Sequence, residues 1–373
     1  MLLEAIFKIG KPLSILFILN LINSIEASFI TREPASHERK NVFFAVTMND
    51  KERETKLERK RIACIGNSIQ YFNDCPRLLE RISNGKISHQ DSCLRGGVSL
   101  VTILEQGNGM RNKFRTKNAI KQCTDGERNT IKYDIGSPSV KSLLCGSTGN
   151  INVNFNQVNC NLWDIVIMND HTQSLARLSS RQEAIQTVLS EYVPFIRKCG
   201  AIPVLLMTAA YRREGIIGTK DLGTFEDFSG RVDEGYREMA EALAGVLPIS
   251  QTPKVAPVGI AYQMARIENK GIWERLYHDD DFHPSPHGTF LQACVLHFTI
   301  FGCLPDESII LHMLEQDEKG SLNGGLWEHA RMMQPENDRV QPKPNTKEAI
   351  FLLNIARKTC IEFNSSFEAQ SNL

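Results

Sequence analysis

The chain has 373 residues, and 42% of them are apolar, which is enough to bury one large core or two smaller ones and excludes disorder throughout. Lysine plus arginine and aspartate plus glutamate both number 43, so the formal net charge of zero does not indicate a nucleic-acid partner. The 25 glycines and 15 prolines follow no repeat, which excludes collagen-like and solenoid structures.

The first 27 residues have the pattern of a secretory signal peptide. Lys8 and Lys11 precede the apolar run 12–22, and small residues follow as far as Ala27, after which we predict cleavage. This run is shorter than the roughly 20 residues of a membrane-spanning helix, and no later segment is long and apolar enough to span a membrane. We therefore predict a secreted protein or one of the endomembrane lumen, with no mature membrane span unless the leader stays as a signal anchor.

Ten cysteines form an even set, and a secretory leader would place them where disulfides persist. We expect some disulfide bonds, although Cys64 and Cys294 lie in apolar runs that are typical of buried thiols. Asn364 begins an Asn-Ser-Ser sequon, which predicts a glycoprotein.

The domain boundaries follow from changes in composition. Residues 50–61 contain ten charged side chains in twelve, so we predict a charged flexible linker over residues 28–58. The apolar run 62–65 ends at Gly66 and predicts a buried strand, which begins a folded domain over residues 59–363. Residues 364–373 are predicted to be a disordered tail.

A strand, a helix and a second strand follow one another in the middle of the chain. Residues 163–168 and 202–207 are the apolar strand candidates. Between them, Ser180 to Glu183 reads as a capping box for an amphipathic helix that ends at Gly200, with a kink at Pro194. Because this order is typical of a crossover between parallel strands, we predict an α/β protein with a parallel sheet.

Further elements are predicted downstream by the same patterns. We expect helices over residues 232–247, 288–301 and 347–363, and a strand over 255–261. The last helix has an apolar face, so it should pack back on the sheet.

Three polar motifs lie where the chemistry of an open α/β sheet is expected, after strands. They are Gly66-Asn67-Ser68, Asn169-Asp170 and the loop from Asp279 to Pro284. Taken singly, each is more often a turn or a helix cap.

In this order the motifs resemble those of the GDSL or SGNH hydrolase superfamily, over roughly residues 59–303. The resemblance implies a three-layer α/β/α sandwich with a flavodoxin-like parallel sheet. It also implies that Ser68 is the nucleophile, with Asp280 and His283 as the acid and base. The oxyanion hole would consist of the backbone N–H groups of Ser68 and Gly97 and the side-chain amide of Asn169.

Two departures and one alternative accompany the resemblance. Asn67 stands where the family usually has aspartate, as in branches that resemble carbohydrate esterases, and Ile167 stands where it usually has glycine. Asn67 keeps one acceptor oxygen of aspartate, so it can still stabilise a turn. Gly96 competes with Gly97 for the glycine of the second motif.

The residue types themselves fit acyl transfer. A serine hydroxyl becomes a good nucleophile when an imidazole takes its proton, and the imidazole needs a carboxylate to fix its tautomer. Asp280 and His283, three residues apart, can supply both groups from one loop.

We therefore predict a serine ester hydrolase without a cofactor, acting on a small-molecule or polysaccharide ester such as an O-acylated carbohydrate. Three alternatives stay open: a glycan-binding relative without turnover, an O-acyltransferase, and a divalent-metal site. The metal site would use the cluster His278, Asp279, Asp280, Asp281, His283 and His287.

Overall fold

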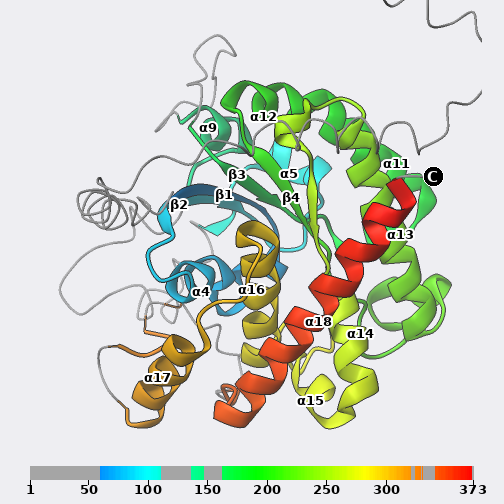
Figure 1. The fold of residues 1–373 in the computed structure, drawn as a ribbon. Helices are drawn as coiled ribbons and strands as arrows, with labels where there is room; N and C mark the ends of the chain where they lie inside the picture. Colours follow the sequence, from blue (N-terminus) through cyan, green and yellow to red (C-terminus); the bar gives the residue numbers. More distant parts are fainter. Residues whose placement is uncertain are drawn as a thin grey trace, which may run out of the picture. The chain divides into compact units, whose positions relative to one another are not determined.

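The computed structural model describes residues 59–110, 136–146, 162–320, 324–328, 330 and 341–371 (Figure 1). The five strands of this part of the chain are β1 (Lys60–Gly66), β2 (Ile87–Leu94), β3 (Ile165–Met168), β4 (Ile202–Leu206) and β5 (Lys254–Ala256). Its helices up to β5 are α3 (Ser68–Tyr71), α4 (Cys75–Ile82), α5 (Leu100–Gln106), α9 (Val140–Cys145), α10 (Thr172–Ala176), α11 (Leu178–Thr187), α12 (Val193–Cys199) and α13 (Phe225–Ala244). The helices after β5 are α14 (Val258–Glu268), α15 (Lys270–Arg275), α16 (Pro286–Phe301), α17 (Glu307–Glu318) and α18 (Thr346–Ser371).

The strands form one parallel sheet in the order β2-β1-β3-β4-β5. This is the flavodoxin-like order, in which the chain changes direction across the sheet between β1 and β3. Ligands of such sheets bind beyond the carboxyl ends of the strands at this point. Ser68 follows β1 and Asn169 follows β3, so both lie beyond the carboxyl ends of these two neighbouring strands.

Helices cover both faces of the sheet (Figure 1). On one face α4, α14, α16 and α18 pack against one another, and on the other face lie α5, α9, α11 and α12. The predicted three-layer α/β/α sandwich with a flavodoxin-like sheet is therefore confirmed.

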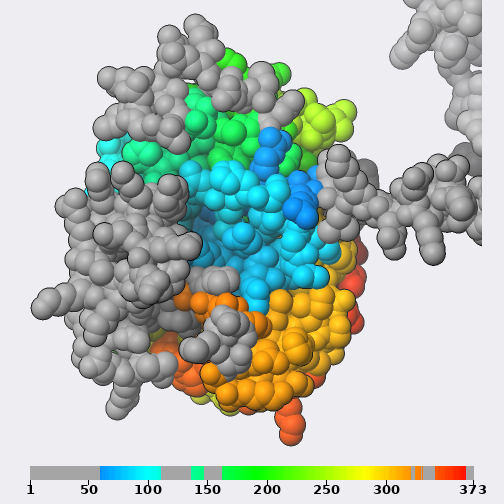
Figure 2. Space-filling view, turned by 90° about the vertical axis from the view of Figure 1, so that its left-hand side faces the viewer, coloured from blue at the N-terminus to red at the C-terminus, as the bar shows by residue number. Residues whose placement is uncertain are grey.

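The central strands are apolar because both of their faces are covered. All four residues of β3 are buried, including Ile167, which replaces the usual glycine of the third motif and packs in the core. The edge strand β2 differs, since its middle residues are polar and only partly buried, and the sequence pattern did not predict it. Figure 2 shows the face that includes this edge, where residues 60–110, in blue and cyan, lie above α17, in orange.

The capping box predicted at Ser180 is wrong. Helix α11 begins earlier, at Leu178, and the Ser180 hydroxyl donates to the carbonyl of Ser174 at 2.8 Å instead of capping a helix. The predicted kink at Pro194 takes the form of a π-helical turn, Val188–Tyr192, because a proline cannot donate a backbone hydrogen bond. The helix ends at Gly200 as predicted, with a left-handed φ of 76°.

Other boundaries also differ from the predictions. The strand predicted over 255–261 ends at Ala256, and Val258 already begins α14, because a short apolar run fits a strand and a buried helix equally well. Helix α18 continues to Ser371 through most of the predicted tail. The predicted leader and linker, residues 1–58, lie outside the described residues.

None of the eight described cysteines forms a disulfide with another described cysteine, so the expected bridges are not found in this part of the chain. Seven of them are buried, Cys64 and Cys294 as predicted, and Cys303 is exposed. Cys123 and Cys160 lie outside the described residues. No helix among the described residues is long and apolar enough to cross a membrane.

Candidate active site

Ser68 lies at the turn between β1 and α3. The turn begins at Gly66, whose φ of 154° suits a glycine, and a Cβ there would overlap the side chain of Asn169. Asn67 caps the following helix, since its Oδ1 accepts a hydrogen bond from the backbone N–H of Ile69 at 3.1 Å. Ser68 itself is 7% exposed, so little of its surface is accessible to solvent.

The amide of Asn67 explains why asparagine can replace the aspartate of the usual motif. Its Nδ2 donates to the backbone carbonyl of Val98 at 3.0 Å, while its Oδ1 accepts from Asn169 Nδ2 at 2.8 Å. An ionised carboxylate cannot donate to a carbonyl. Asn67 therefore joins the Ser68 turn directly to the loop that carries Gly97.

His283 lies in a closed loop between α15 and α16. Tyr277 and Pro284 form an isolated antiparallel bridge, and the backbone N–H of His278 donates to the carbonyl of His283 at 2.8 Å. The turn of this loop contains Asp281, which has a left-handed φ of 71° and pairs with Arg212, whose Nε lies 2.5 Å from Asp281 Oδ1. The loop is thus fixed at both its base and its tip.

Asp280 and His283 form the pair that the sequence predicts. The Nδ1 of His283 lies 2.7 Å from Asp280 Oδ2, and the His283 backbone N–H donates to Asp280 Oδ1 at 2.9 Å. Burial raises the pKa of Asp280, but the nearby imidazoles of His278 and His283 outweigh it and bring the pKa well below its usual range. The carboxylate therefore stays ionised and orients the imidazole, leaving Nε2 on the side away from Asp280.

Ser68 and His283 line the same cavity, of about 350 Å³. Two contacts join the segment after Ser68 to the His283 loop. The rings of Phe72 and His283 stack with centroids 3.8 Å apart and an interplanar angle of 5°. Asn73 donates from Nδ2 to the carbonyl of Pro284 at 3.0 Å and to the hydroxyl of Thr289 at 3.1 Å. The structure thus brings together side chains that are more than two hundred residues apart.

Gly97 also lines this cavity, as does its competitor Gly96. The two positions need glycine for different reasons. Gly97 has a left-handed φ of 69°, whereas a Cβ on Gly96 would come within 2.6 Å of the hydroxyl oxygen of Tyr71. That hydroxyl forms a side-chain hydrogen bond with Ser68, and burial raises the pKa of Tyr71 to about 12. Tyr71 therefore stays protonated beside the predicted nucleophile.

Asn169 is close to this group but is not among the residues that line the cavity. It is 1% exposed, and its Nδ2 donates to Asn67 Oδ1 at 2.8 Å and to the carbonyl of Asp170 at 3.1 Å. Its Oδ1 accepts from Gln70 Nε2 at 2.8 Å, which fixes the orientation of the amide. Both amide hydrogens are therefore engaged within the protein.

Most of the remaining cavity wall was missed by sequence reasoning. It is mostly apolar and aromatic and includes a histidine and a threonine; the residues are Ile69, Tyr71, Phe72, His171, Thr172, Tyr211, Ile217 and Phe282. A position shortly after a strand was a usable signal for Ile69, His171, Thr172 and Tyr211. Burial, together with Arg177 and His283, lowers the pKa of His171, so this side chain favours its neutral form.

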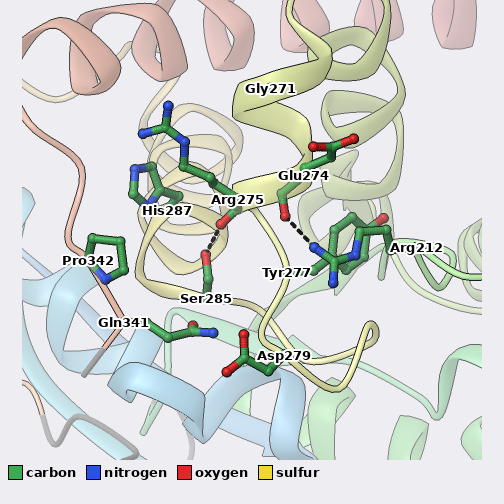
Figure 3. A pocket seen from close by; sticks show the side chains of 10 residues that line it. All are labelled: Arg212, Gly271, Glu274, Arg275, Tyr277, Asp279, Ser285, His287, Gln341 and Pro342. Carbon is green, nitrogen blue, oxygen red and sulfur yellow. Dashed lines mark hydrogen bonds between the residues drawn. The ribbon is translucent and has the colours of Figure 1, made fainter. Parts of the chain in front are cut away.

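A second cavity, of about 420 Å³, shares the loop that carries His283 but contains neither Ser68 nor His283 (Figure 3). Its two arginines have internal partners: Arg212 donates from Nη1 to the carbonyl of Glu274 at 2.8 Å, and Arg275 pairs with Glu348. Glu348 also accepts from His287. We assign no ligand to this cavity.

The cluster proposed as a metal site is divided among different partners. Asp280 is engaged with His283, Asp281 with Arg212, and His287 with Glu348. Among the described residues, no three ligand-type side chains gather as they do around a metal ion. The metal alternative thus finds no support in this part of the chain.

No protein-family model matches the chain, and no curated protein matches it. The solved structures that are similar to it include the following two. One is a candidate SGNH hydrolase from Slackia heliotrinireducens, 22% identical with a TM-score of 0.42, covering 65% of this chain and 99% of that one. The other is a DUF4886 family protein from Bacteroides uniformis, 15% identical with a TM-score of 0.50, covering 81% of this chain and 95% of that one.

The likeness to the structure from Bacteroides uniformis bears on the fold alone. The structure from Bacteroides uniformis shares the architecture along most of its length. Together with the sheet order, it supports the three-layer α/β/α fold that the sequence predicts.

Proposed function

We propose that this chain is a serine ester hydrolase that works through an acyl-enzyme and needs no cofactor. The observation that carries the proposal is the cavity that Ser68 and His283 share, with Asp280 Oδ2 lying 2.7 Å from His283 Nδ1. A hydroxyl, an imidazole and an ionised carboxylate in this order are the groups that activate a serine.

The reaction follows from the roles of these groups. Ser68 Oγ attacks the ester carbonyl carbon while His283 takes the hydroxyl proton, and Asp280 stabilises the imidazolium that forms. The backbone N–H groups of Ser68 and Gly97 stabilise the negative oxygen of the tetrahedral intermediate. His283 then gives its proton to the departing alcohol, and a water molecule, activated by the same imidazole, releases the acid and regenerates Ser68.

We further propose that the substrate is an O-acylated carbohydrate or a similar ester, and that the protein is exported. The substrate class rests on the resemblance of the Gly-Asn-Ser motif to carbohydrate-esterase-like branches. Export rests on the leader pattern of residues 1–27. A screen of p-nitrophenyl esters together with acetylated xylan tests the first proposal, and N-terminal sequencing of the protein recovered from expressing cells tests the second.

The nucleophile is tested by Ser68→Ala. We expect this variant to lose both ester hydrolysis and covalent labelling by a fluorophosphonate probe, because it lacks the oxygen that forms the acyl-enzyme. Ser190→Ala, at an exposed serine of the π-helical turn, is the matched control and should retain both. Labelling that persists in Ser68→Ala would show that another residue is the nucleophile.

A further inference from the structure

Ile217 lies at the edge of the Ser68 cavity with an unusual backbone. It lines the cavity, and 55% of its surface is exposed. Its φ of 50° and ψ of 42° place it in the left-handed region, which β-branched residues rarely adopt. The neighbouring Gly215 and Gly218 adopt the same region with φ of 71° and 74°, at little cost for a glycine.

A hydrogen-bond network holds Ile217 in this conformation. Gln173 Nε2 donates to the carbonyl of Ile217 at 2.9 Å, and Arg177 Nη2 donates to the carbonyl of Gly218 at 2.7 Å. Arg177 is itself fixed by Asp221, with Nε 2.7 Å from Oδ2, and by Gln173 Oε1 at 2.8 Å. Gln173 of helix α10 and Arg177 thus maintain Ile217 in a strained backbone conformation that a glycine or an asparagine would adopt more easily.

The side chain of Ile217 continues an apolar part of the cavity wall. Tyr211 and Phe282 line the same cavity, with ring centroids 5.4 Å apart, and Gln173 Nε2 lies 3.3 Å from the Tyr211 hydroxyl. An exposed isoleucine that extends an aromatic wall offers a hydrocarbon surface to whatever enters the cavity. Strain that the surrounding structure maintains at such a place points to a functional contact.

We propose that Ile217 determines specificity by contacting a hydrocarbon group of the ester substrate, so that esters with a longer apolar group are preferred over those with a shorter one. The inference rests on the proposed ester hydrolase and adds the chemistry of its substrate. The hydrocarbon group belongs to either the acyl chain or the alcohol, and two series of substrates distinguish these sources.

The test compares kcat/KM along two series. The first is p-nitrophenyl acetate, butyrate, hexanoate and octanoate, and the second is ethyl, butyl and hexyl acetate. Ile217→Asn removes the apolar side chain while suiting the left-handed backbone, and Ile217→Leu keeps an apolar side chain. Ile249→Ala is the matched control, because Ile249 is 95% exposed and is not among the residues that line the cavity.

We expect Ile217→Asn to lower kcat/KM for the longest ester of one series by about tenfold and for its shortest ester by less than about twofold, since each buried methylene is worth about fourfold. Ile217→Leu and Ile249→Ala should keep the chain-length preference of the unsubstituted protein. Should Ile217→Asn not fold, Ile217→Gly removes the same contact with a compatible backbone.

The two levels of the proposal fail in different ways. If the folded, unsubstituted protein hydrolyses no ester of either series, the proposed ester hydrolase function is refuted. A chain that hydrolyses esters, with chain-length ratios unchanged by Ile217→Asn in both series, refutes the role of Ile217 alone.

Discussion

Asn169 holds the turn that carries Ser68. Its amide spans from Gln70, inside the protein, to Asn67, which caps helix α3. The sequence motif predicts this side chain as the third donor of the oxyanion hole, but both of its hydrogens are engaged with Asn67 and with the carbonyl of Asp170. To stabilise an oxyanion, the amide must release one of these two hydrogen bonds.

Asn169→Ala tests this donor. If it serves the oxyanion, kcat should fall by about a hundred- to a thousandfold, the usual effect of losing one such donor. Gln70→Met is the control, because it removes the buried hydrogen bond to Asn169 Oδ1 but no candidate oxyanion donor. An equal loss of kcat in both variants would assign Asn169 to positioning, and an unchanged kcat in Asn169→Ala would remove it from the mechanism.

Helices α10 and α13 meet at a glycine. A Cβ on Gly235 would overlap the backbone carbonyl of Leu175, whereas a Cβ on Gly230 of the same helix would meet nothing within 4 Å. We expect Gly235→Ala to lower the free energy of unfolding by about 1–3 kcal/mol, as overpacking does. Gly230→Ala should raise it by roughly 0.5–1 kcal/mol, through helix propensity. Urea unfolding of both variants measures this, and equal effects would contradict the close packing of α10 on α13.

Asp170 links the end of β3 to the start of α5. Its Oδ1 accepts from the backbone N–H groups of Leu100 at 3.1 Å and His171 at 2.6 Å, while its Oδ2 is buried with no partner in the described structure. Burial raises the pKa of Asp170 to about 7, from about 3.9 in an unfolded chain. The folded state therefore favours the protonated carboxyl.

The stability contributed by this raised pKa is complete below about pH 4 and is lost as the pH rises through about 7. Asp170→Asn keeps an acceptor oxygen and does not ionise. We expect the original chain to lose stability relative to this variant between pH 4 and pH 8, as measured by urea midpoints at each pH. Parallel pH curves for the two proteins would show that the pKa of Asp170 is the same in the folded and the unfolded chain.

For the molecule as a whole, the sequence predicts the elements that are buried on both sides. The strands β1, β3 and β4 read as continuous apolar runs because helices cover both faces of the sheet. Ser68, Asp280 and His283 could be named from motif order alone, and the structure places them together. The edge strand β2 gives no such signal, since its middle residues are polar and partly exposed.

What the sequence could not predict depends on contacts between distant segments. Asn67 donates a hydrogen bond to the carbonyl of Val98, and Gln70 fixes the orientation of the Asn169 amide. Neither Val98 nor Gln70 belongs to a sequence motif that would indicate these contacts. The strained backbone of Ile217 is likewise unexpected, because propensity disfavours it and tertiary hydrogen bonds maintain it. The expectation of disulfides rested on composition, whereas seven of the eight described cysteines are packed in the core.

The distance along the chain between Ser68 and His283 affects when the protein can act. Ser68 belongs to the beginning of the folded domain, while the imidazole, its carboxylate and the hydroxyl of Thr289 that anchors Asn73 come after the last strand, β5. During synthesis the amino-terminal part emerges from the ribosome first. Under the proposed mechanism, a nascent or prematurely terminated polypeptide would carry the serine without the imidazole that takes its proton, so ester hydrolysis would begin only once translation has passed the start of α16.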